Sequence, residues 1–425
     1  MIVLLPIIAA LAVEGLAHAW PHSSRTDAES TLMWIAGTQP PFVCGRDGLC
    51  RSDLELEHLS NKAPRVFPEL ASAGTFRVVC LGDSTTAGLP YSPRGGYPEW
   101  LGEILRDVLP GRRIEVLNLG FAGWDGTRVE SFFGQALSLR PQAVILRVGY
   151  NDGSLLLLRH ARGGANERIM REAHLFLLAR STAYRLLARV IRPPLRPGFP
   201  TGEVVWTADE RLHVIAEHRD RLDRLASSAH EAGVPLIVLG IPRRTVSPSP
   251  EIVPHDPFED ANAEESRKLG LPFVPLTELA AQDLFVDSVH SNAEGNRLTA
   301  LNVARSLAAL GTPVPGHSWR WERLRSTGDL ARAIGMDEPG YRAHLELSLA
   351  GIFLGQGRSG PADAHLETAL LVAPNPDMIP SELTLDPKGP LRAAYRRIFT
   401  RLRREGRVAD PRQSRDRELA GLPPR

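Results

Sequence analysis

The stretch "VVCLGDSTTAG", residues 78–88, is a run of small apolar residues that ends abruptly in an acid and a hydroxyl. With the residues just before it, the run predicts a glycine-bounded strand over 75–82 that is buried on both faces. In open α/β sheets, ligands bind beyond the carboxyl ends of such strands. Asp83 and Ser84 are therefore the first candidates for a functional site.

Similar apolar runs alternate with helical patterns along the chain. The predicted strands span 112–120, 141–149 and 234–240, and the predicted helices span 97–109, 127–138, 208–233 and 292–311. Continuously apolar strands that alternate with helices imply a parallel sheet covered on both faces. The sequence therefore predicts an α/β fold with a three-layer, flavodoxin-like parallel sheet.

The overall composition sets limits on domain count and ligands. A length of 425 residues exceeds what one hydrophobic core usually organises, so two or three domains are expected. The 50 Lys plus Arg balance 49 Asp plus Glu, and a net charge of +1 gives no indication of nucleic-acid binding. No His or Cys cluster has zinc-like spacing and no Walker-type phosphate loop occurs, so neither a metal nor a cofactor is expected.

The first twenty residues, "MIVLLPIIAALAVEGLAHAW", carry an apolar core shorter than the roughly 20 residues that span a bilayer. The segment ends in Ala17-His18-Ala19, which fits a signal-peptide cleavage site, although the usual positive charges are absent. Residues 1–20 are predicted to be an export signal or a membrane anchor, the alternative being a buried helix. The protein is expected to be exported, either periplasmic or anchored and facing the periplasm or the exterior.

Cysteine usage is consistent with export. Cys44 and Cys50 lie in "PFVCGRDGLCR", within a predicted N-terminal extension at 21–74, where a glycine-containing turn could bring the sulfurs together. A disulfide there would suit an oxidising compartment, and two free thiols remain the alternative. Cys80 is expected to be an inert core residue.

Three of the predicted strands end in polar, glycine-rich segments: 82–84, 120–123 and 149–152. In a flavodoxin-like strand order the first and third strands flank the point where the order reverses. Ser84 and Asn151 are then expected to face each other across one crevice. The acids Asp83 and Asp152 are expected to bond nearby backbone N–H groups.

A serine needs a correctly oriented base to act as a nucleophile at neutral pH. In "DLFVDSVHSNAEGN", residues 283–296, Asp287 precedes His290 by three residues, and one turn could present both groups. His255, next to Asp256 in a Pro-rich stretch, is a rival base and is more simply read as a surface histidine. The proposed chain order is Ser, Asp, His.

Four segments together resemble the four signature blocks of the SGNH/GDSL hydrolases, an esterase and lipase superfamily, and the resemblance covers residues 75–311. The segments are Gly82-Asp83-Ser84, Asn118 to Gly123, Gly149-x-Asn151-Asp152 and Asp287-x-x-His290. The resemblance implies that Ser84 is the nucleophile, that His290 is the base and that Asp287 orients the imidazole. It assigns the oxyanion hole to the backbone N–H groups of Ser84 and Gly123 and the side-chain amide of Asn151. Gly120 competes with Gly123, which is preferred because its distance from Asn118 matches the family pattern.

The hydrolase region carries a predicted helical insertion at 152–207. Residues 172–200 have apolar residues at helical spacing with Arg between them, and the pattern stops at Pro193-Pro194. A helix packed on the domain with solvated Arg is the simplest interpretation. A lid over the acyl site and a contact with anionic lipid are the alternatives.

Beyond Gly311 the pattern changes to helices without strands, and 312–404 is predicted to be a helical extension. Within it, 347–376 resembles a single tetratricopeptide repeat; the matching positions are Leu349, Phe353, Ala362, Leu366, Ala369 and Pro374. Such repeats normally need about three units for stability, so docking onto the hydrolase domain is expected. Residues 405–425 are predicted to be a disordered tail.

The leading functional prediction is a serine esterase acting on acyl or acetyl esters of a small molecule, an envelope lipid or a polysaccharide. An O-acyltransferase with a sugar hydroxyl as acceptor is a close variant. The alternative class is an envelope-tethered interaction protein with vestigial catalysis, whose C-terminal helices recruit a protein partner. Membrane association would then come through the N-terminus.

Overall fold

The computed structural model describes residues 40–54, 64–152, 208–244, 256–281, 284–313, 316–372 and 390–408, together with Glu57, Ser60, Lys62, Leu177, Ser181, Ala183, Tyr184 and Leu187. The predicted export signal at 1–20, nearly all of the insertion at 152–207, His255, Pro374 and most of the tail at 405–425 lie outside the described residues. Within these ranges, none of the helices combines the length and hydropathy that crossing a bilayer requires.

The centre of the molecule is a five-stranded parallel sheet in the order β5-β4-β6-β7-β8. Its strands are β4 (Thr75–Gly82), β5 (Arg113–Gly120), β6 (Ala143–Arg147), β7 (Leu236–Leu239) and β8 (Phe273–Val274). The chain runs from β4 outward to β5 and then returns to place β6 on the other side of β4. The flavodoxin-like order is therefore confirmed, and the order reverses between β4 and β6.

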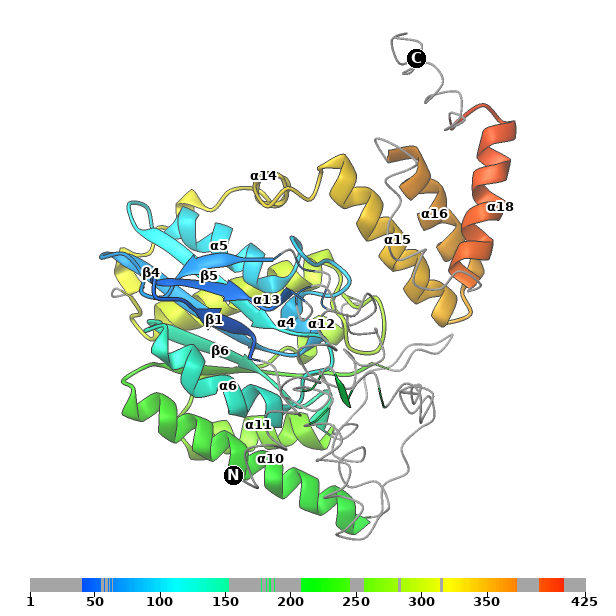
Figure 1. Cartoon of the computed structure of the whole chain (residues 1–425). Helices are drawn as coiled ribbons and strands as arrows, with labels where there is room; N and C mark the ends of the chain where they lie inside the picture. Colours follow the sequence, from blue (N-terminus) through cyan, green and yellow to red (C-terminus); the bar gives the residue numbers. More distant parts are fainter. Residues whose placement is uncertain are drawn as a thin grey trace, which may run out of the picture.

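Helices cover both faces of this sheet (Figure 1). On one face lie α5 (Tyr97–Val108) and α13 (Ala293–Ala309), and on the other lie α6 (Gly126–Ser138) and α10 (Ala208–Glu231). Alternate residues of β4 enter the two cores: Val78 and Cys80 face α5 and α13, while Val79 and Leu81 face α6 and α10. The three-layer prediction is thus confirmed.

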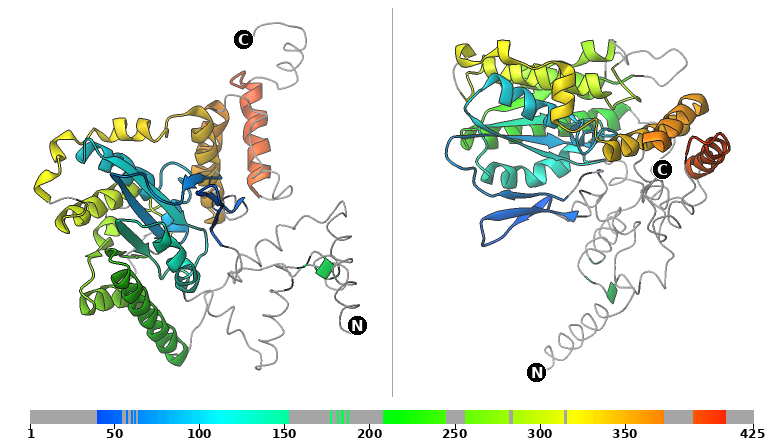
Figure 2. Two further views of the ribbon diagram at one scale, coloured as in Figure 1. Left: turned by 60° about the vertical axis from the view of Figure 1, so that its left-hand side comes forward. Right: turned by 90° about the horizontal axis from the view of Figure 1, so that it is seen from above.

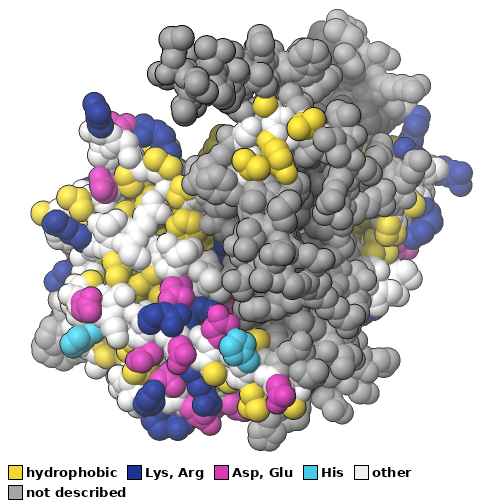
Figure 3. Space-filling view, turned by 60° about the horizontal axis from the view of Figure 1, so that its bottom comes forward, with side chains coloured by type: hydrophobic (Ala, Val, Ile, Leu, Met, Phe, Trp, Pro, Cys, Tyr) yellow, Lys and Arg dark blue, Asp and Glu magenta, His cyan; other side chains and the backbone are white. Residues whose placement is uncertain are grey.

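Some short or polar elements were not predicted. The strand β8 has only two residues. The helices α11 (Pro257–Lys268) and α12 (Thr277–Ala281) have no clear helical spacing of apolar residues in their sequences. Figure 3 shows acidic and basic side chains interspersed on the face built from α10 and α11, where Arg219 pairs with Glu264. Such a charged, short-range pattern gives little apolar periodicity to detect.

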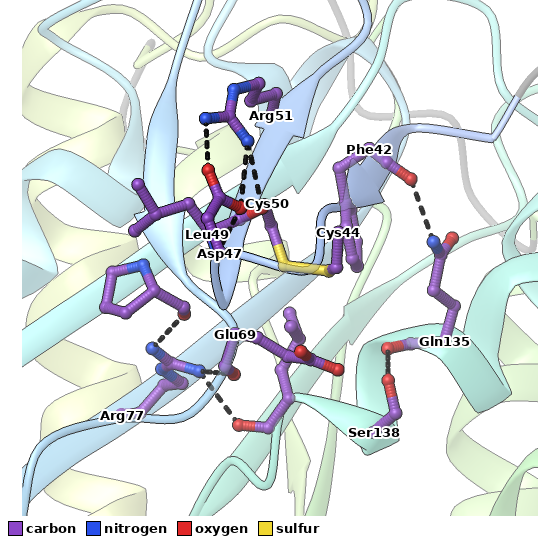
Figure 4. The surroundings of a disulfide bond; sticks show 12 residues. Phe42, Cys44, Asp47, Leu49, Cys50, Arg51, Glu69, Arg77, Gln135 and Ser138 are labelled. Carbon is purple, nitrogen blue, oxygen red and sulfur yellow. Dashed lines mark hydrogen bonds and ion pairs between the residues drawn. A yellow bond between two sulfur atoms is a disulfide. The ribbon is translucent and has the colours of Figure 1, made fainter.

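A second, antiparallel sheet precedes the parallel sheet along the chain and was also missed. It consists of β1 (Phe42–Cys44), β2 (Leu49–Ser52) and β3 (Val66–Pro68). Cys44 and Cys50 face each other across β1 and β2 and form a disulfide, which decides between the two alternatives left by the sequence (Figure 4).

Two side chains tie this small sheet to the hydrolase fold. The Nε2 of Gln135 on α6 donates to the Phe42 carbonyl at 2.8 Å (Figure 4). Arg77 on β4 is fully buried, and its guanidinium donates to the Pro68 and Glu69 carbonyls at 2.7 and 2.6 Å. A buried guanidinium is stable only when such acceptors satisfy it. The N-terminal extension is therefore part of the same packed body.

The C-terminal extension is helical throughout the described residues. After α13 come the short 3₁₀ helices η1 (Gly316–Ser318) and η2 (Trp321–Arg323), followed by α14 (Thr327–Ala333), α15 (Pro339–Gly355), α16 (Ser359–Val372) and α18 (Pro390–Arg404). Ala362 and Ala369 of α16 are fully buried in the helical pair that α15 and α16 form. The tetratricopeptide assignment itself stays a prediction.

Helix α15 packs directly on the hydrolase fold, and both views of Figure 2 place α15, α16 and α18 together at one end of the described molecule. The Tyr341 hydroxyl donates to the Tyr91 carbonyl at 2.7 Å, and these two side chains share an apolar cluster with Leu345 and Leu349. Gln356, just after α15, donates through Nε2 to the Val286 carbonyl at 3.1 Å. The helical extension thus contacts the loops at the end of the sheet.

Candidate active site

Ser84 is the first residue of α4 (Ser84–Ala87), the short helix that begins where β4 ends. The Asp83 side chain caps this helix, because its Oδ1 accepts from the Thr85 N–H at 2.8 Å and the Thr85 hydroxyl at 2.7 Å. Burial raises the pKa of Asp83, while its bonds with Thr85 act in the opposite direction. The predicted local role of Asp83 is confirmed, and the turn that carries Ser84 is fixed.

Gly120 also serves this turn. A Cβ at Gly120 would lie 2.4 Å from the Ala87 backbone nitrogen, so only glycine lets β5 end against α4. This packing requirement gives Gly120 a role of its own, separate from donating to a substrate. Gly123, three residues later, has a φ of +65°, a left-handed conformation that favours glycine.

His290 and Asp287 come from the loop between α12 and α13. The His290 Nε2 lies 2.8 Å from the Ser84 Oγ, and its Nδ1 lies 2.6 Å from the Asp287 Oδ2. The fold therefore brings Ser84 to a pair of residues 206 positions away, and the three side chains form one continuous line of hydrogen bonds. The geometry matches a serine, a base and the carboxylate that orients it.

The loop around Asp287 is closed by its own hydrogen bonds. Asp287 Oδ1 accepts from the backbone N–H groups of Val289 at 2.9 Å and His290 at 2.7 Å, while the Val286 N–H donates to the His290 carbonyl at 2.9 Å. Burial opposes ionisation of Asp287, but the bonds and charge of His290 hold the pKa of that carboxyl below its usual value. The carboxylate can thus both fix the loop and orient the imidazole.

Asn151 follows β6 and lies beside the loop after β5. Its Nδ2 donates to the Trp124 carbonyl at 3.0 Å, which ties the Asn151 amide to the segment that contains Gly123. A side-chain amide carries two N–H groups, so this bond uses one and leaves a second donor. Two of the three predicted oxyanion groups, Gly123 and Asn151, thus come from loops that are bonded to each other at the carboxyl edge of the sheet.

Asp152 holds more than the local backbone contacts that the sequence predicted. It accepts from the Gly126 N–H at 2.6 Å, contacts the His218 Nδ1 at 2.5 Å and pairs with Arg221 at 3.0 Å. Burial opposes ionisation of Asp152, but the charge and hydrogen bond of His218, followed by the charge of Arg221, lower its pKa to about 2. The carboxylate therefore joins the Asn151 loop to α6 and α10.

Sequence reasoning missed His218 and its second partner. The His218 Nε2 lies 2.9 Å from the Asn262 Oδ1, and the Asn262 Nδ2 donates to the Val148 carbonyl at 3.0 Å. Since that bond fixes the amide orientation, both ring nitrogens of His218 face acceptors. His218 was one of thirteen histidines inside a polar helical pattern, and no local signal distinguished it.

The described residues contain no cluster of three or more His, Cys, Asp or Glu that could hold a metal ion. Burial raises the pKa of the Cys80 thiol, which lies fully buried in β4. That thiol is consistent with the inert core role predicted for it.

Comparison with solved structures finds chains of similar size to the hydrolase region. An α/β hydrolase named LAE5, from the metagenome of Lake Arreo in Spain, is 17% identical and aligns over 56% of this chain and 98% of its own with a TM-score of 0.36. Axe2, an acetylxylan esterase from Geobacillus stearothermophilus, is 16% identical over 56% and 96%, with a TM-score of 0.35. An acetyl xylan esterase, AlAXEase, is 15% identical over 54% and 99%, with a TM-score of 0.36.

Comparison with curated proteins finds no match. The family model for the GDSL-like lipase/acylhydrolase family matches residues 80–298, which is more than half of the chain and includes Ser84, Gly123, Asn151, Asp287 and His290. The chain therefore belongs to the GDSL-like lipase/acylhydrolase family and is an ester-hydrolysing enzyme.

Proposed function

We propose that this protein is a serine esterase that cleaves acyl or acetyl esters through Ser84, His290 and Asp287. The observation that carries the proposal is the unbroken line of hydrogen bonds from the Ser84 Oγ through His290 to Asp287. A serine hydroxyl becomes an effective nucleophile when a neighbouring base can accept its proton. The His290 Nε2 is within reach to do so.

The proposed reaction has two halves. The Ser84 Oγ attacks the ester carbonyl carbon while His290 takes the hydroxyl proton; the tetrahedral intermediate then collapses and the alcohol leaves with that proton. Water next attacks the acyl-enzyme while His290 takes its proton; the second tetrahedral intermediate then collapses, His290 returns that proton to the Ser84 Oγ, and the acid leaves. Asp287 holds the imidazole in the tautomer that this sequence requires and stabilises its positive charge.

The charge that develops on the carbonyl oxygen needs fixed donors. We assign these to the Ser84 and Gly123 backbone N–H groups and the Asn151 side-chain amide. Donors that are held in place before the reaction lower the barrier without reorganising. The bond from Asn151 to the Trp124 carbonyl supports this assignment, because it orients the amide and the Gly123 segment together.

The substrate that fits this proposal is an ester of a small molecule, an envelope lipid or a polysaccharide. Export is part of the same proposal, and the Cys44–Cys50 disulfide supports an oxidising compartment. Thiol alkylation of protein isolated from intact cells, with and without prior reduction, tests this: the two cysteines should react only after reduction.

The deciding experiment is hydrolysis of p-nitrophenyl esters from acetate to palmitate by the full chain. Ser84→Ala and His290→Ala should each lower kcat by about 10⁴-fold or more, while Ser138→Ala, on the exposed side of α6, should leave it unchanged. The preferred chain length separates a deacetylase from a lipase. Turnover that survives Ser84→Ala would remove the proposal.

A further inference from the structure

A buried polar cluster joins the N-terminal extension to the end of β5 and the loop after it, and its N-terminal members precede the residues that the family model matches. The Lys62 Nζ lies 3.0 Å from the Asn118 carbonyl oxygen and 3.3 Å from the Asn118 Oδ1. Lys62 is only 8% exposed, and its amino group lies 3.7 Å from the Glu57 carboxylate. The long side chain thus reaches Asn118, near the end of β5, from a distant part of the sequence.

Two further contacts extend this connection along the loop. The Ser60 Oγ accepts from the Ala122 backbone N–H at 3.0 Å, and Ser60 is fully buried. The Lys62 Nζ also lies over the Phe121 ring at 4.3 Å from its centroid. Phe121 and Ala122 directly precede Gly123, so the extension contacts the loop up to the residue before the assigned oxyanion donor.

The inner side of the cluster is fixed as well. The Asn118 Nδ2 donates to the Glu99 Oε1 of α5 at 2.9 Å, while the Asn118 Oδ1 accepts from the Gly120 N–H at 3.1 Å. Burial lowers the pKa of Lys62 and raises the pKa of Glu99. A buried amino group is costly unless acceptors surround it, and the two hydrogen bonds that Lys62 donates to described residues both end on Asn118.

We propose that Lys62 and Ser60 are positioning residues for ester hydrolysis, which hold the segment 118–123, the end of β5 and the loop after it, so that the Gly123 N–H is aimed at the developing oxyanion. The inference rests on the proposed function, since it acts through the oxyanion hole assigned there. A preorganised donor works only when its position is fixed, and a displacement of about 1 Å can cost about 10²-fold in rate. The N-terminal extension is thereby part of the catalytic apparatus.

The test compares Ser60→Ala with Ser52→Ala in the full chain. Both variants remove one hydroxyl from the N-terminal extension, but within the described residues the Ser52 hydroxyl bonds to the Arg65 backbone, and the Ser60 hydroxyl bonds to Ala122 in the loop after β5. Ser60→Ala should lower kcat for p-nitrophenyl acetate by about tenfold with KM changed by less than about twofold. Ser52→Ala should leave both values unchanged.

A second readout isolates the tetrahedral step. A p-nitrophenyl phosphonate reacts with the serine to give an anionic tetrahedral adduct, so its rate of inactivation depends on the oxyanion donors and not on deacylation. Ser60→Ala and Lys62→Met should both slow inactivation by about the same factor as they lower kcat. If Lys62→Met does not fold, the comparison of Ser60→Ala with Ser52→Ala decides the question without it.

The outcomes separate this inference from the proposed function. If Ser84→Ala abolishes turnover but Ser60→Ala matches Ser52→Ala in kcat and in phosphonate inactivation, the positioning role is wrong and the esterase stands. A loss confined to KM would also overturn the positioning role. If Ser84→Ala retains turnover, the esterase proposal fails and the positioning role fails with it.

Discussion

Two segments outside the family region contact different halves of the proposed site by different means. The segment with Ser60 and Lys62 contacts the oxyanion half, which holds Gly123 and Asn151, and helix α15 contacts the acid–base half, which holds His290 and Asp287. The N-terminal segment reaches the Asn118 loop with buried polar groups, Ser60 and Lys62. Helix α15 reaches the Asp287 loop and the loop after α4 mainly through an apolar cluster, with bonds from Tyr341 and Gln356 at its edges.

This difference predicts how strongly a single substitution should affect each contact. Removing one partner of a buried polar contact leaves the others unsatisfied, so its loss is steep. Apolar packing distributes its stabilisation over many atom pairs, so a single change gives a graded loss. The oxyanion half is therefore expected to be more sensitive to single changes at its outer contacts than the acid–base half.

The largest effect should come from altering the acid–base half directly. Asp287→Asn removes the acceptor that fixes the His290 tautomer and should lower kcat by about 10⁴-fold at neutral pH. Steady-state kinetics with p-nitrophenyl acetate measure it, and Asp329→Asn on the exposed surface of α14 is the matched control. A loss of less than tenfold for Asp287→Asn would show that another group orients the imidazole.

The oxyanion half should respond next. Asn151→Ala removes one assigned donor and should lower kcat by about 10²- to 10³-fold with little change in KM. The same variant loses the bond to the Trp124 carbonyl, so phosphonate inactivation is measured alongside. An effect on KM alone would mean that Asn151 binds the ground state and not the oxyanion.

The free energy of unfolding should distinguish the buried contact of Lys62 from the exposed ion pair of Arg94 and Glu338 near the start of α15. Lys62→Met should lower the free energy of unfolding by about 3 kcal/mol, because it leaves buried acceptors without a donor. Arg94→Met breaks the ion pair with Glu338, the residue just before α15. Because both side chains are partly exposed, the free energy of unfolding should fall by at most about 1 kcal/mol.

Urea unfolding at low and high salt measures both changes. Salt should shrink the Arg94 effect and leave the Lys62 effect, because exposed charges are screened and buried ones are not. Equal losses for the two variants at every salt concentration would contradict the distinction between the buried polar contact and the exposed one.

The smallest predicted effect lies at the end of α15. Gln356→Ala removes the donor to the Val286 carbonyl, next to Asp287, and should lower kcat by about threefold. Gln135→Ala is a matched control, because it removes a similar bond to the Phe42 carbonyl far from His290. If both variants behave alike in kinetics, α15 contributes only to stability.

The sequence predicted the parts of the molecule that local pattern determines. The strands β4 to β7 were found within a few residues because buried parallel strands are continuously apolar. Ser84, Asp287 and His290 were found because their motifs stand at element ends in the right order. The structure brings these three together, and their roles remain the proposal.

The parts that were missed depend on contacts between distant segments. Strands β1 to β3 have only three or four residues each, too few for a period to show. Ser60 and Lys62 carry no local signal, since their importance comes from Asn118 and Ala122 more than fifty residues later. His218 likewise becomes notable only when α10 and α11 bring it between Asp152 and Asn262.

The order of these contacts along the chain has a consequence for biogenesis. Ser84 and His290 are 206 residues apart, and Gln356 lies 70 residues beyond Val286, the residue whose carbonyl it bonds. During synthesis, Lys62 and the nucleophile therefore emerge long before the groups that complete the site. On the proposed mechanism, the growing chain carries a Ser84 without its base until His290 has been synthesised, so esterase activity cannot precede synthesis of the His290 loop.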